Sequence, residues 1–276
     1  MRTTWGLATD RGRVREINED AILAQPPIFL VADGMGGYDA GDRASQIVVD
    51  SFRTLAEQGS VSTAEVHSQF ELATAQLREM LETEKRAGST VAGAAVVNQD
   101  GVDYWLIFNI GDSRVYSWHE GRLKQISVDH SVVQELIEAG VINDSQAAHH
   151  PQRHQVTRAL ATHVAPDPDY WLIPFHAATR ILICSDGLTN EVADPEIART
   201  LQTHEDAQDA ADSLIASALS AGGRDNVSVV VVDLLPRHDG GNGERSTTNG
   251  VAATANTALK NQFEGSTIPR GFGRKT

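Results

Sequence analysis

"IFLVADGMGG", residues 28–37, runs a series of apolar side chains directly into Asp33 and then into three glycines. "ILICSDGL", residues 181–188, repeats this design around Asp186. Apolar runs rich in β-branched residues are typical of strands that are buried on both faces. A single Asp-Gly step after a strand predicts only a turn, because both residues suit turn geometry. Two buried strands that end in the same way need a further reason.

Other acidic residues stand in the same position relative to apolar strands. Asp112 follows a strand-like run in "IFNIGDSR" (107–114), and Asp225 precedes one in "GGRDNVSVVVV" (222–232). The pair Glu19 and Asp20, in "RVREINEDA", comes just before the apolar run "AILA". If these strands are neighbours in packed sheets, several carboxylates meet at one edge. Their charges would raise one another's pKa or force the sheets apart unless cations lie between them.

Divalent cations are the expected solution, since Mg²⁺ and Mn²⁺ prefer carboxylate, carbonyl and water oxygens. Gly34 would let the backbone approach an ion and present its carbonyl, and the two later glycines would permit the turn into a helix. Two ions that share an acid can activate water and hydrolyse phosphate esters. Arg15, close to the Glu19 and Asp20 pair, is suited to hold the phosphate as a bidentate fork. The residues therefore predict a two-metal phosphate site.

The rest of the chain predicts a layered α+β protein. Strand-like runs cluster, and helical patterns come in pairs instead of alternating strictly with strands, which argues against a doubly wound parallel sheet. Asp100-Gly101 and Glu120-Gly121 are expected hairpin turns. Strands are predicted at 3–10, 28–33, 90–98, 102–112, 113–119, 180–186 and 226–234. Helices are predicted at 40–57, from Ser62 onward, where "STAE" is a capping box, at about 131–139 and at about 204–220.

Composition limits the possible partners. The formal charge of −14 argues against nucleic acid or an anionic membrane surface, because the average field repels phosphate. Cys184 is the single cysteine, so no internal disulfide can form. The sequence shows no secretory leader and no apolar run long enough to span a membrane, so we expect a cytoplasmic protein. Residues 1–235 are expected to form the folded domain, and the Gly-, Asn-, Thr- and Ser-rich segment 236–276 to be a disordered tail.

Eight segments occur in an order that resembles a known family. They are "RVREINEDA", "VADGMGG", "GST" (88–90), "NIGDSRVY", "DHSVVQEL", "HPQRHQVTRAL", "CSDGLTNEV" and "GGRDNVSVVVV". Their order and spacing resemble the metal-dependent serine/threonine protein phosphatases, the protein phosphatase 2C or PPM family, in its compact bacterial form. The resemblance covers about residues 3–234.

The resemblance implies a four-layer αββα sandwich, in which two antiparallel sheets pack face to face between helical layers. It implies two core Mg²⁺ or Mn²⁺ ions bridged by Asp33, and a weaker third ion. The remaining implied roles are the Gly34 carbonyl as ligand, Asp186 and Asp225 on the first ion, Glu19 and Asp20 holding waters on the second, Asp112 with Asp186 on the third, and Arg15 on the phosphate.

Three positions depart from the family pattern. Asn190 stands where many relatives have another Asp for the third ion, so that ion is expected to bind more weakly. Ala161 replaces a usual Gly after the flap-like segment, with a local effect. Met35 replaces the His that is a candidate general acid in other members, so the sequence leaves open which group protonates the leaving alkoxide.

The favoured function is hydrolysis of phosphoserine and phosphothreonine in proteins by direct attack of a metal-bridging hydroxide, without a phosphoenzyme. By family resemblance, the partners would be phosphorylated proteins and a bacterial serine/threonine kinase whose products the enzyme reverses. Two alternatives stay open. One is a pseudophosphatase that binds phosphoproteins without hydrolysis, and the other is a phosphatase controlled by partners in trans.

Several conspicuous residues have simpler structural explanations. Ser89 and Thr90 have no paired base and are expected to begin a strand. Other residues in this group are His149, His150 and His154, expected in a flap-like loop; His130, expected to order its own loop; Cys184, Trp105 and Trp118, expected in the core or on a sheet face; and Arg114, expected in a structural ion pair.

Overall fold

The computed structural model describes residues 2–36, 40–56, 58–83, 87–99, 101–160, 167–175 and 180–235. Within these ranges the chain forms eleven strands and seven helices. The predicted tail, residues 236–276, and Ala161 lie outside the described residues.

The strands form two sheets, and every pairing between the named strands is antiparallel. The first sheet has the order β1 (Arg2–Asp10), β11 (Val227–Leu235), β10 (Arg180–Cys184), β7 (Arg114–His119) and β8 (Arg122–Gln125). The second has the order β2 (Asp20–Gln25), β3 (Ile28–Gly36), β5 (Val91–Gln99), β6 (Val102–Ile110) and β9 (Asp169–Pro174), with the short β4 (Ala87–Ser89) paired to β3.

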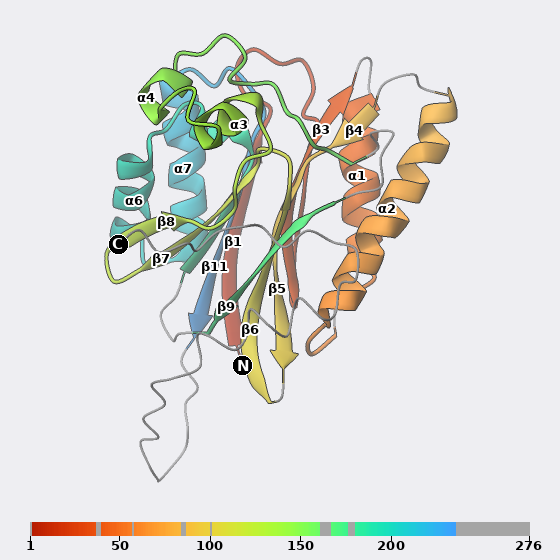
Figure 1. Cartoon of the computed structure of the whole chain (residues 1–276). Coiled ribbons are helices and arrows are strands. Elements are labelled where there is room, and N and C mark those ends of the chain that lie inside the picture. The colour runs from red at the N-terminus through yellow and green to blue at the C-terminus, as the bar shows by residue number, and fades with distance from the viewer. Residues whose placement is uncertain are drawn as a thin grey trace.

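Two helix pairs cover the outer faces of the sheets, as Figure 1 shows. The second sheet is covered by α1 (Ala40–Arg53) and α2 (Thr63–Thr83), and the first by α6 (Asp194–Thr203) and α7 (Ala207–Ala221). The short helices are α3 (Val132–Glu138), α4 (Asp144–Ala147) and α5 (Asp186–Thr189). The predicted αββα layering is therefore confirmed.

Three apolar cores separate the four layers. Phe29 and Trp105 meet Ile183 and Val230 between the sheets, where the rings of Phe29 and Trp105 pack edge to face. Phe52, Phe70 and Phe108 fill the core under α1 and α2, and Leu182, Leu214 and Val229 lie in the core under α7. Complete burial of a side chain such as Phe70 contributes roughly 1.5–3 kcal/mol.

Strand β11 shows why the central strands read as continuous apolar runs. Val229 and Val231 belong to the core under α7, whereas Val230 and Val232 belong to the core between the sheets. Successive side chains of a strand point to opposite faces, so a strand buried on both faces needs apolar residues at every position.

The helix start at Ser62 and the two hairpin turns that the sequence predicted are present in the structure. Ser62 and Glu65 form the predicted capping box at the start of α2, with the Glu65 N–H donating to Ser62 Oγ at 3.2 Å and the Ser62 N–H donating to Glu65 Oε2 at 2.7 Å. Gly101 (φ 82°), Glu120 (φ 49°) and Gly121 (φ 78°) adopt the left-handed conformations of tight hairpin turns.

Some boundaries differ from the prediction. The strand predicted to reach Asp112 ends at Ile110, because Gly111 turns the chain with φ 111°. Asp186 does not continue β10 but opens α5. The structure also contains elements that the sequence did not predict, namely β2, β4, β8, β9, α4, α5 and α6.

Among the described residues, no helix combines the length and the apolar character needed to cross a bilayer.

Candidate active site

The acidic strand ends meet at one end of the sandwich, the upper end in Figure 1, where β3 finishes and β11 begins. Asp33 in β3 and Asp20 at the start of β2 are direct cross-strand partners. Asp186 follows β10 and Asp225 precedes β11, and these two strands are neighbours in the other sheet. Strand β11 also contacts β2 and β3 across the sandwich. The fold thus brings together acids that are far apart in the sequence.

Burial and mutual repulsion raise the pKa values of Asp20, Asp33, Asp112 and Asp186. Burial, followed by the neighbouring carboxylates of Asp20 and Asp186, raises the pKa of Asp33 well above its usual range. The pKa of Asp20 is raised to about 7 and that of Asp112 to about 8, in both cases chiefly by burial. Burial and the charge of Asp225 raise the pKa of Asp186. Such a group of acids favours either protons or cations between its members.

Asp20 carries the clearest sign of a missing positive partner. Its Oδ2 accepts a hydrogen bond from Ser185 Oγ at 2.8 Å, but its buried Oδ1 has no hydrogen-bond partner. A buried acceptor without a partner costs roughly 1–3 kcal/mol, and more when it is charged. The donor set and this orphaned oxygen fit a divalent cation with oxygen ligands.

The acids do not form a ready-made cage. Within the described ranges, no group of three or more Asp, Glu, His or Cys side chains is arranged to hold a metal ion. Mg²⁺ usually keeps several waters and binds through only one or two carboxylates, so an open arrangement of acids is compatible with this type of ion.

Gly34 is required by close backbone packing. A Cβ atom there would lie 2.0 Å from the Gly41 carbonyl oxygen and 2.6 Å from that of Glu19, and the Gly34 N–H donates to the Glu19 oxygen at 3.1 Å. The Glu19 side chain lies against the start of α1, because a Cβ atom on Gly41 would be 2.1 Å from Glu19 Oε1. Burial raises the pKa of Glu19. A ligand role for the Gly34 carbonyl stays a prediction.

Arg15 lies beside the acids and pairs with one of them. Its Nη2 donates to Asp225 Oδ2 at 2.7 Å, and this hydrogen bond is the main reason why the pKa of Arg15 is raised. About half of the side chain is exposed (49%). A guanidinium has five N–H donors, so further donors are available for an anion at this position.

Asn226 organises the loop that carries Arg15 and Glu19, a role that was not predicted from the sequence. Its Nδ2 donates to the carbonyls of Arg11 and Ile17, both at 2.9 Å, while its Oδ1 accepts from the Glu19 N–H at 2.9 Å. Asn226 is nearly fully buried. Its position directly after Asp225 was a possible signal, but its partners lie more than 200 residues earlier in the chain.

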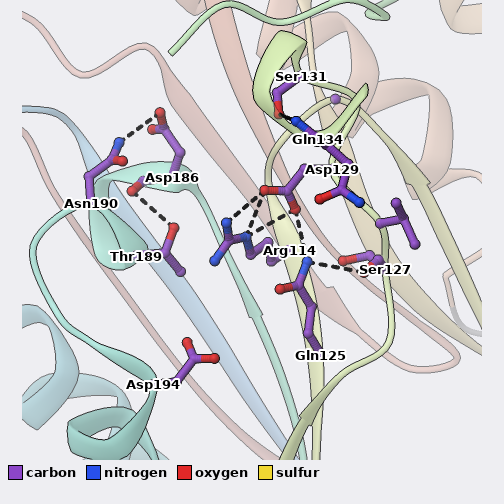
Figure 2. A network of polar contacts seen from close by, with 12 residues as sticks. Arg114, Gln125, Ser127, Asp129, Ser131, Gln134, Asp186, Thr189, Asn190 and Asp194 are labelled. Atoms are coloured by element: carbon purple, nitrogen blue, oxygen red, sulfur yellow. Dashed lines mark hydrogen bonds and ion pairs between the residues drawn. The ribbon is translucent and has the colours of Figure 1, made fainter. Parts of the chain in front are cut away.

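Asn190 faces Asp186 with its amide nitrogen. Figure 2 shows the two side chains joined, and Asn190 Nδ2 donates to Asp186 Oδ2 at 3.0 Å. Asn190 is the residue that ends α5, the short helix that Asp186 begins. Its side chain therefore orients Asp186 in this structure, and a role as ligand of a third ion stays a prediction.

Arg114 forms the structural ion pair that was predicted for it. Its Nε and Nη2 donate to the Asp129 carboxylate at 2.7–3.0 Å, as Figure 2 shows, and its Nη1 donates to Tyr116 Oη at 3.1 Å. Gln125 Nε2 adds a hydrogen bond to Asp129 at 2.9 Å. This network lies between β7 and the segment before α3. The charge of Arg114 lowers the pKa of Asp112 and of Asp186, whereas the charge of Asp129 raises the pKa of Asp112.

His130 orders its loop, as predicted. The Gly111 N–H donates to its Nδ1 at 3.0 Å, so Nε2 carries the proton and donates to Asp169 at 3.2 Å. These bonds fix the turn that presents Asp112. Cys184 is a buried core thiol whose pKa burial raises to about 12.

Ser89 and Thr90 are buried and hydrogen-bonded within the fold. Thr90 Oγ1 accepts a hydrogen bond from the Asp33 N–H at 3.2 Å and so helps to position Asp33. Asp33 is one member of the acid cluster, which consists of Glu19, Asp20, Asp33, Asp112, Asp186 and Asp225.

Comparison with known proteins identifies the family. Residues 12–221 match the family model described as protein phosphatase 2C.

The chain belongs to the protein phosphatase 2C family.

Named relatives agree with this assignment. The chain is 35% identical over 243 residues to the serine/threonine phosphatase stp of Listeria welshimeri serovar 6b, a match that covers 82% of this chain and 93% of the relative. A solved Mycobacterium tuberculosis serine/threonine phosphatase, PstP/Ppp, superposes with a TM-score of 0.80 at 34% identity and covers 85% of this chain and 99% of that one. The protein is thus a protein-serine/threonine phosphatase.

A second solved structure bears on the metal. The catalytic domain of a serine/threonine protein phosphatase named PstP, described in complex with two manganese ions, matches at 32% identity with a TM-score of 0.77. It covers 85% of this chain and 99% of that domain. Metal dependence of the manganese type is therefore supported for this phosphatase 2C family member.

Proposed function

We propose that this phosphatase hydrolyses phosphoserine and phosphothreonine in proteins with two divalent ions, Mn²⁺ or Mg²⁺, held at the acidic end of the sandwich, and that it does so in the cytoplasm. The observation that carries the proposal is the group of buried acids with raised pKa values around Asp20, whose Oδ1 lacks a partner. The phosphatase domain would occupy residues 1–235.

The proposed ligands divide into three groups. Asp33 is central, because it is the cross-strand partner of Asp20 in the second sheet and is within electrostatic reach of Asp186 and Asp225, which lie beside strands β10 and β11 of the first sheet. It would be shared by the two ions. The full set is Asp33, the Gly34 carbonyl, Asp186 and Asp225 for the first ion, Glu19 and Asp20 through water for the second, and Asp112 with Asp186, and with Asn190 as a possible ligand, for a weaker third.

When bound, the two ions would activate water for hydrolysis of the phosphate ester. The residues of the chain supply the positions. Thr90 and the pairing with β2 hold Asp33, Ser185 holds Asp20, and Asn226 holds the loop of Arg15. Arg15 would direct its remaining donors at the substrate phosphate.

Met35 belongs to β3, directly after the Asp33-Gly34 step, and provides no acidic proton. The substrates would be proteins phosphorylated by a serine/threonine kinase, and this partnership rests on family resemblance alone.

The decisive experiment compares Asp33→Asn with the wild-type chain. We expect the variant to fold normally, as judged by circular dichroism. Its turnover of p-nitrophenyl phosphate with Mn²⁺ should fall by at least about 100-fold, because removal of a residue that only orients a metal ligand already costs about 10–100-fold in metal affinity or activity. Asp50→Asn, at an exposed position of α1, is the matched control and should keep full activity. Near-normal turnover by Asp33→Asn would reject the proposed mechanism.

The alternative is a binding module on the same fold. Calorimetric titration of the wild-type chain with Mn²⁺, alongside the activity assay, separates the two. Tight metal binding without hydrolysis of any phosphorylated substrate would favour the binding module.

A further inference from the structure

The loop between α7 and β11 carries Asp225 and is anchored by a buried carboxylate from another part of the chain. Glu191 Oε1 accepts hydrogen bonds from the Arg224 backbone N–H at 3.0 Å and from Arg224 Nε at 2.8 Å. Its Oε2 accepts from Arg224 Nη2 at 2.9 Å. Arg224 is the residue directly before Asp225.

This pair differs from most surface ion pairs because the side chain of its carboxylate is buried. Although 69% of the Arg224 side chain is exposed, only 3% of the Glu191 side chain is. The hydrogen bond from Arg224 lowers the pKa of Glu191. Gly222 makes room for the carboxylate, since a Cβ there would lie 3.1 Å from Glu191 Oε2, and its φ of 155° disfavours other residues. A bidentate pair with one buried partner fixes geometry, whereas an exposed pair contributes little.

The pair joins the segment directly after α5, the short helix that Asp186 begins, to the loop that carries Asp225. Glu191 comes directly after Asn190, which ends the helix that Asp186 begins. The loop between α7 and β11 is also bound by the segment that carries Arg15, because the Arg13 N–H donates to the Gly223 carbonyl at 2.7 Å. Asp225 is therefore held between the loop of Arg15 and the end of α5.

We propose that Glu191 and Arg224 are positioning residues that set the spacing of the Asp186 and Asp225 carboxylates and thereby the affinity for the divalent ion between them. The inference rests on the proposed function, because it assigns these two acids to one ion. Neither residue is proposed as a metal ligand or as a substrate contact. Partners that orient metal ligands in this way are typically worth 10–100-fold in metal affinity.

The test uses the full chain with Glu191→Gln and measures Mn²⁺ binding by calorimetry. Glutamine keeps the size of the side chain and one acceptor oxygen but loses the charge and the second acceptor. We expect Mn²⁺ affinity to fall by about 10-fold. At saturating Mn²⁺ we expect kcat for p-nitrophenyl phosphate to stay within a factor of two to three of wild type, because bound metal restores the spacing.

Glu196→Gln is the matched control. Glu196 pairs with Arg199 at 3.5 Å on the exposed face of α6, away from the acid cluster, so its loss should leave Mn²⁺ affinity unchanged. Arg224→Gln is the second variant, chosen because its exposed side chain can be replaced without disturbing the core. If the pair acts as a unit, the double variant should bind Mn²⁺ no more weakly than the weaker single variant.

Thermal unfolding in EDTA separates positioning from simple stabilisation. A lower Tm of Glu191→Gln with unchanged Mn²⁺ affinity would mean that the pair only supports the fold, and would overturn the inference. Unchanged affinity in both single variants would overturn it as well. A wild-type chain that neither binds Mn²⁺ nor hydrolyses phosphate esters would instead reject the proposed function.

Discussion

At the scale of single residues, Arg15 is placed to serve two partners. One of its nitrogens is committed to Asp225 at 2.7 Å, and half of the side chain is exposed beside the acid cluster. A cation that binds Asp225 would compete with this ion pair, whereas a phosphate would use the donors that Asp225 leaves over. Loss of Arg15 should therefore affect phosphate and metal differently.

Arg15→Gln should weaken substrate binding without weakening metal binding. Losing a charge-assisted hydrogen bond costs roughly 1.5–3 kcal/mol, which corresponds to a fall in kcat/KM for p-nitrophenyl phosphate of about 10- to 100-fold. Mn²⁺ affinity, measured by calorimetry, should stay the same or rise, because Asp225 loses a competing cation. Arg11→Gln, in the same loop, is the control and should change neither quantity appreciably. A parallel loss of Mn²⁺ affinity in Arg15→Gln would show that Arg15 mainly holds Asp225 in place.

The residues that the sequence revealed are those with a local signature. Asp33 and Asp186 stand out because each ends an apolar strand beside a glycine. Asn226, Ser185 and Glu191 have no such signature, since their importance comes from partners distant in the chain. Only the assembled fold shows that a carboxylate or an amide at these positions supports the acid cluster.

At the scale of elements, Arg180 ties β10 to β11 and to the end of α6. Its guanidinium forms a bidentate pair with Asp233 at 2.7 Å, and it also donates to the carbonyls of Leu201, His204 and Glu205. The Arg180 side chain is 7% exposed. Because a helix leaves its last carbonyls unpaired, a buried arginine at this position satisfies several of them at once.

Arg180→Met should destabilise the fold while leaving the acid cluster intact. Removing one partner of a buried ion pair typically costs about 3–5 kcal/mol, because the other charge stays buried. Urea unfolding of the EDTA-treated protein measures this loss, and Mn²⁺ affinity should not change. The variant Arg180→Met with Asp233→Leu should recover part of the stability, since no unpaired charge is left. A loss below 1 kcal/mol for Arg180→Met alone would contradict this account.

Elements were predictable where one physical signal dominated. Strand β11, a run of apolar residues buried on both faces, and the capped helix α2 were identified from pattern and capping residues. β8 was not, since "RLKQ" is a short edge strand with polar side chains, and β9 lies in a segment interrupted by prolines. Their conformation depends on the neighbouring strands β7 and β6, and a single sequence carries little sign of such pairing.

At the scale of the whole molecule, the fold concentrates negative charge instead of spreading it. The chain carries a formal charge of −14, and several of its acids lie at one end of the sandwich, where burial raises their pKa values. The composition predicted the excess of acid, and the strand ends predicted where it would gather. The strength of the effect could not be predicted, because it depends on how deeply each carboxylate is buried.

This concentration of acid makes the stability of the metal-free protein depend on pH. The pKa of Asp20 is raised from 3.8 to about 7 and that of Asp112 to about 8. Acids with a raised folded-state pKa stabilise the fold while protonated, so their contribution is complete below about pH 4 and is lost as pH rises through 7 and 8.

In EDTA, the Tm should therefore be lower at pH 8.5 than at pH 5.5. Added Mn²⁺ should raise the Tm more at pH 8.5 than at pH 5.5, because at the higher pH the cations replace protons between ionised carboxylates. Asp20→Asn removes one titrating group, so in EDTA it should be more stable than wild type at pH 8.5 and should depend less on pH. Differential scanning calorimetry of both proteins at both pH values measures the effect. A metal-free wild-type protein that is more stable at pH 8.5 than at pH 5.5 would mean that the acids are ionised and paired within the protein itself, and that the site has no need of a divalent ion.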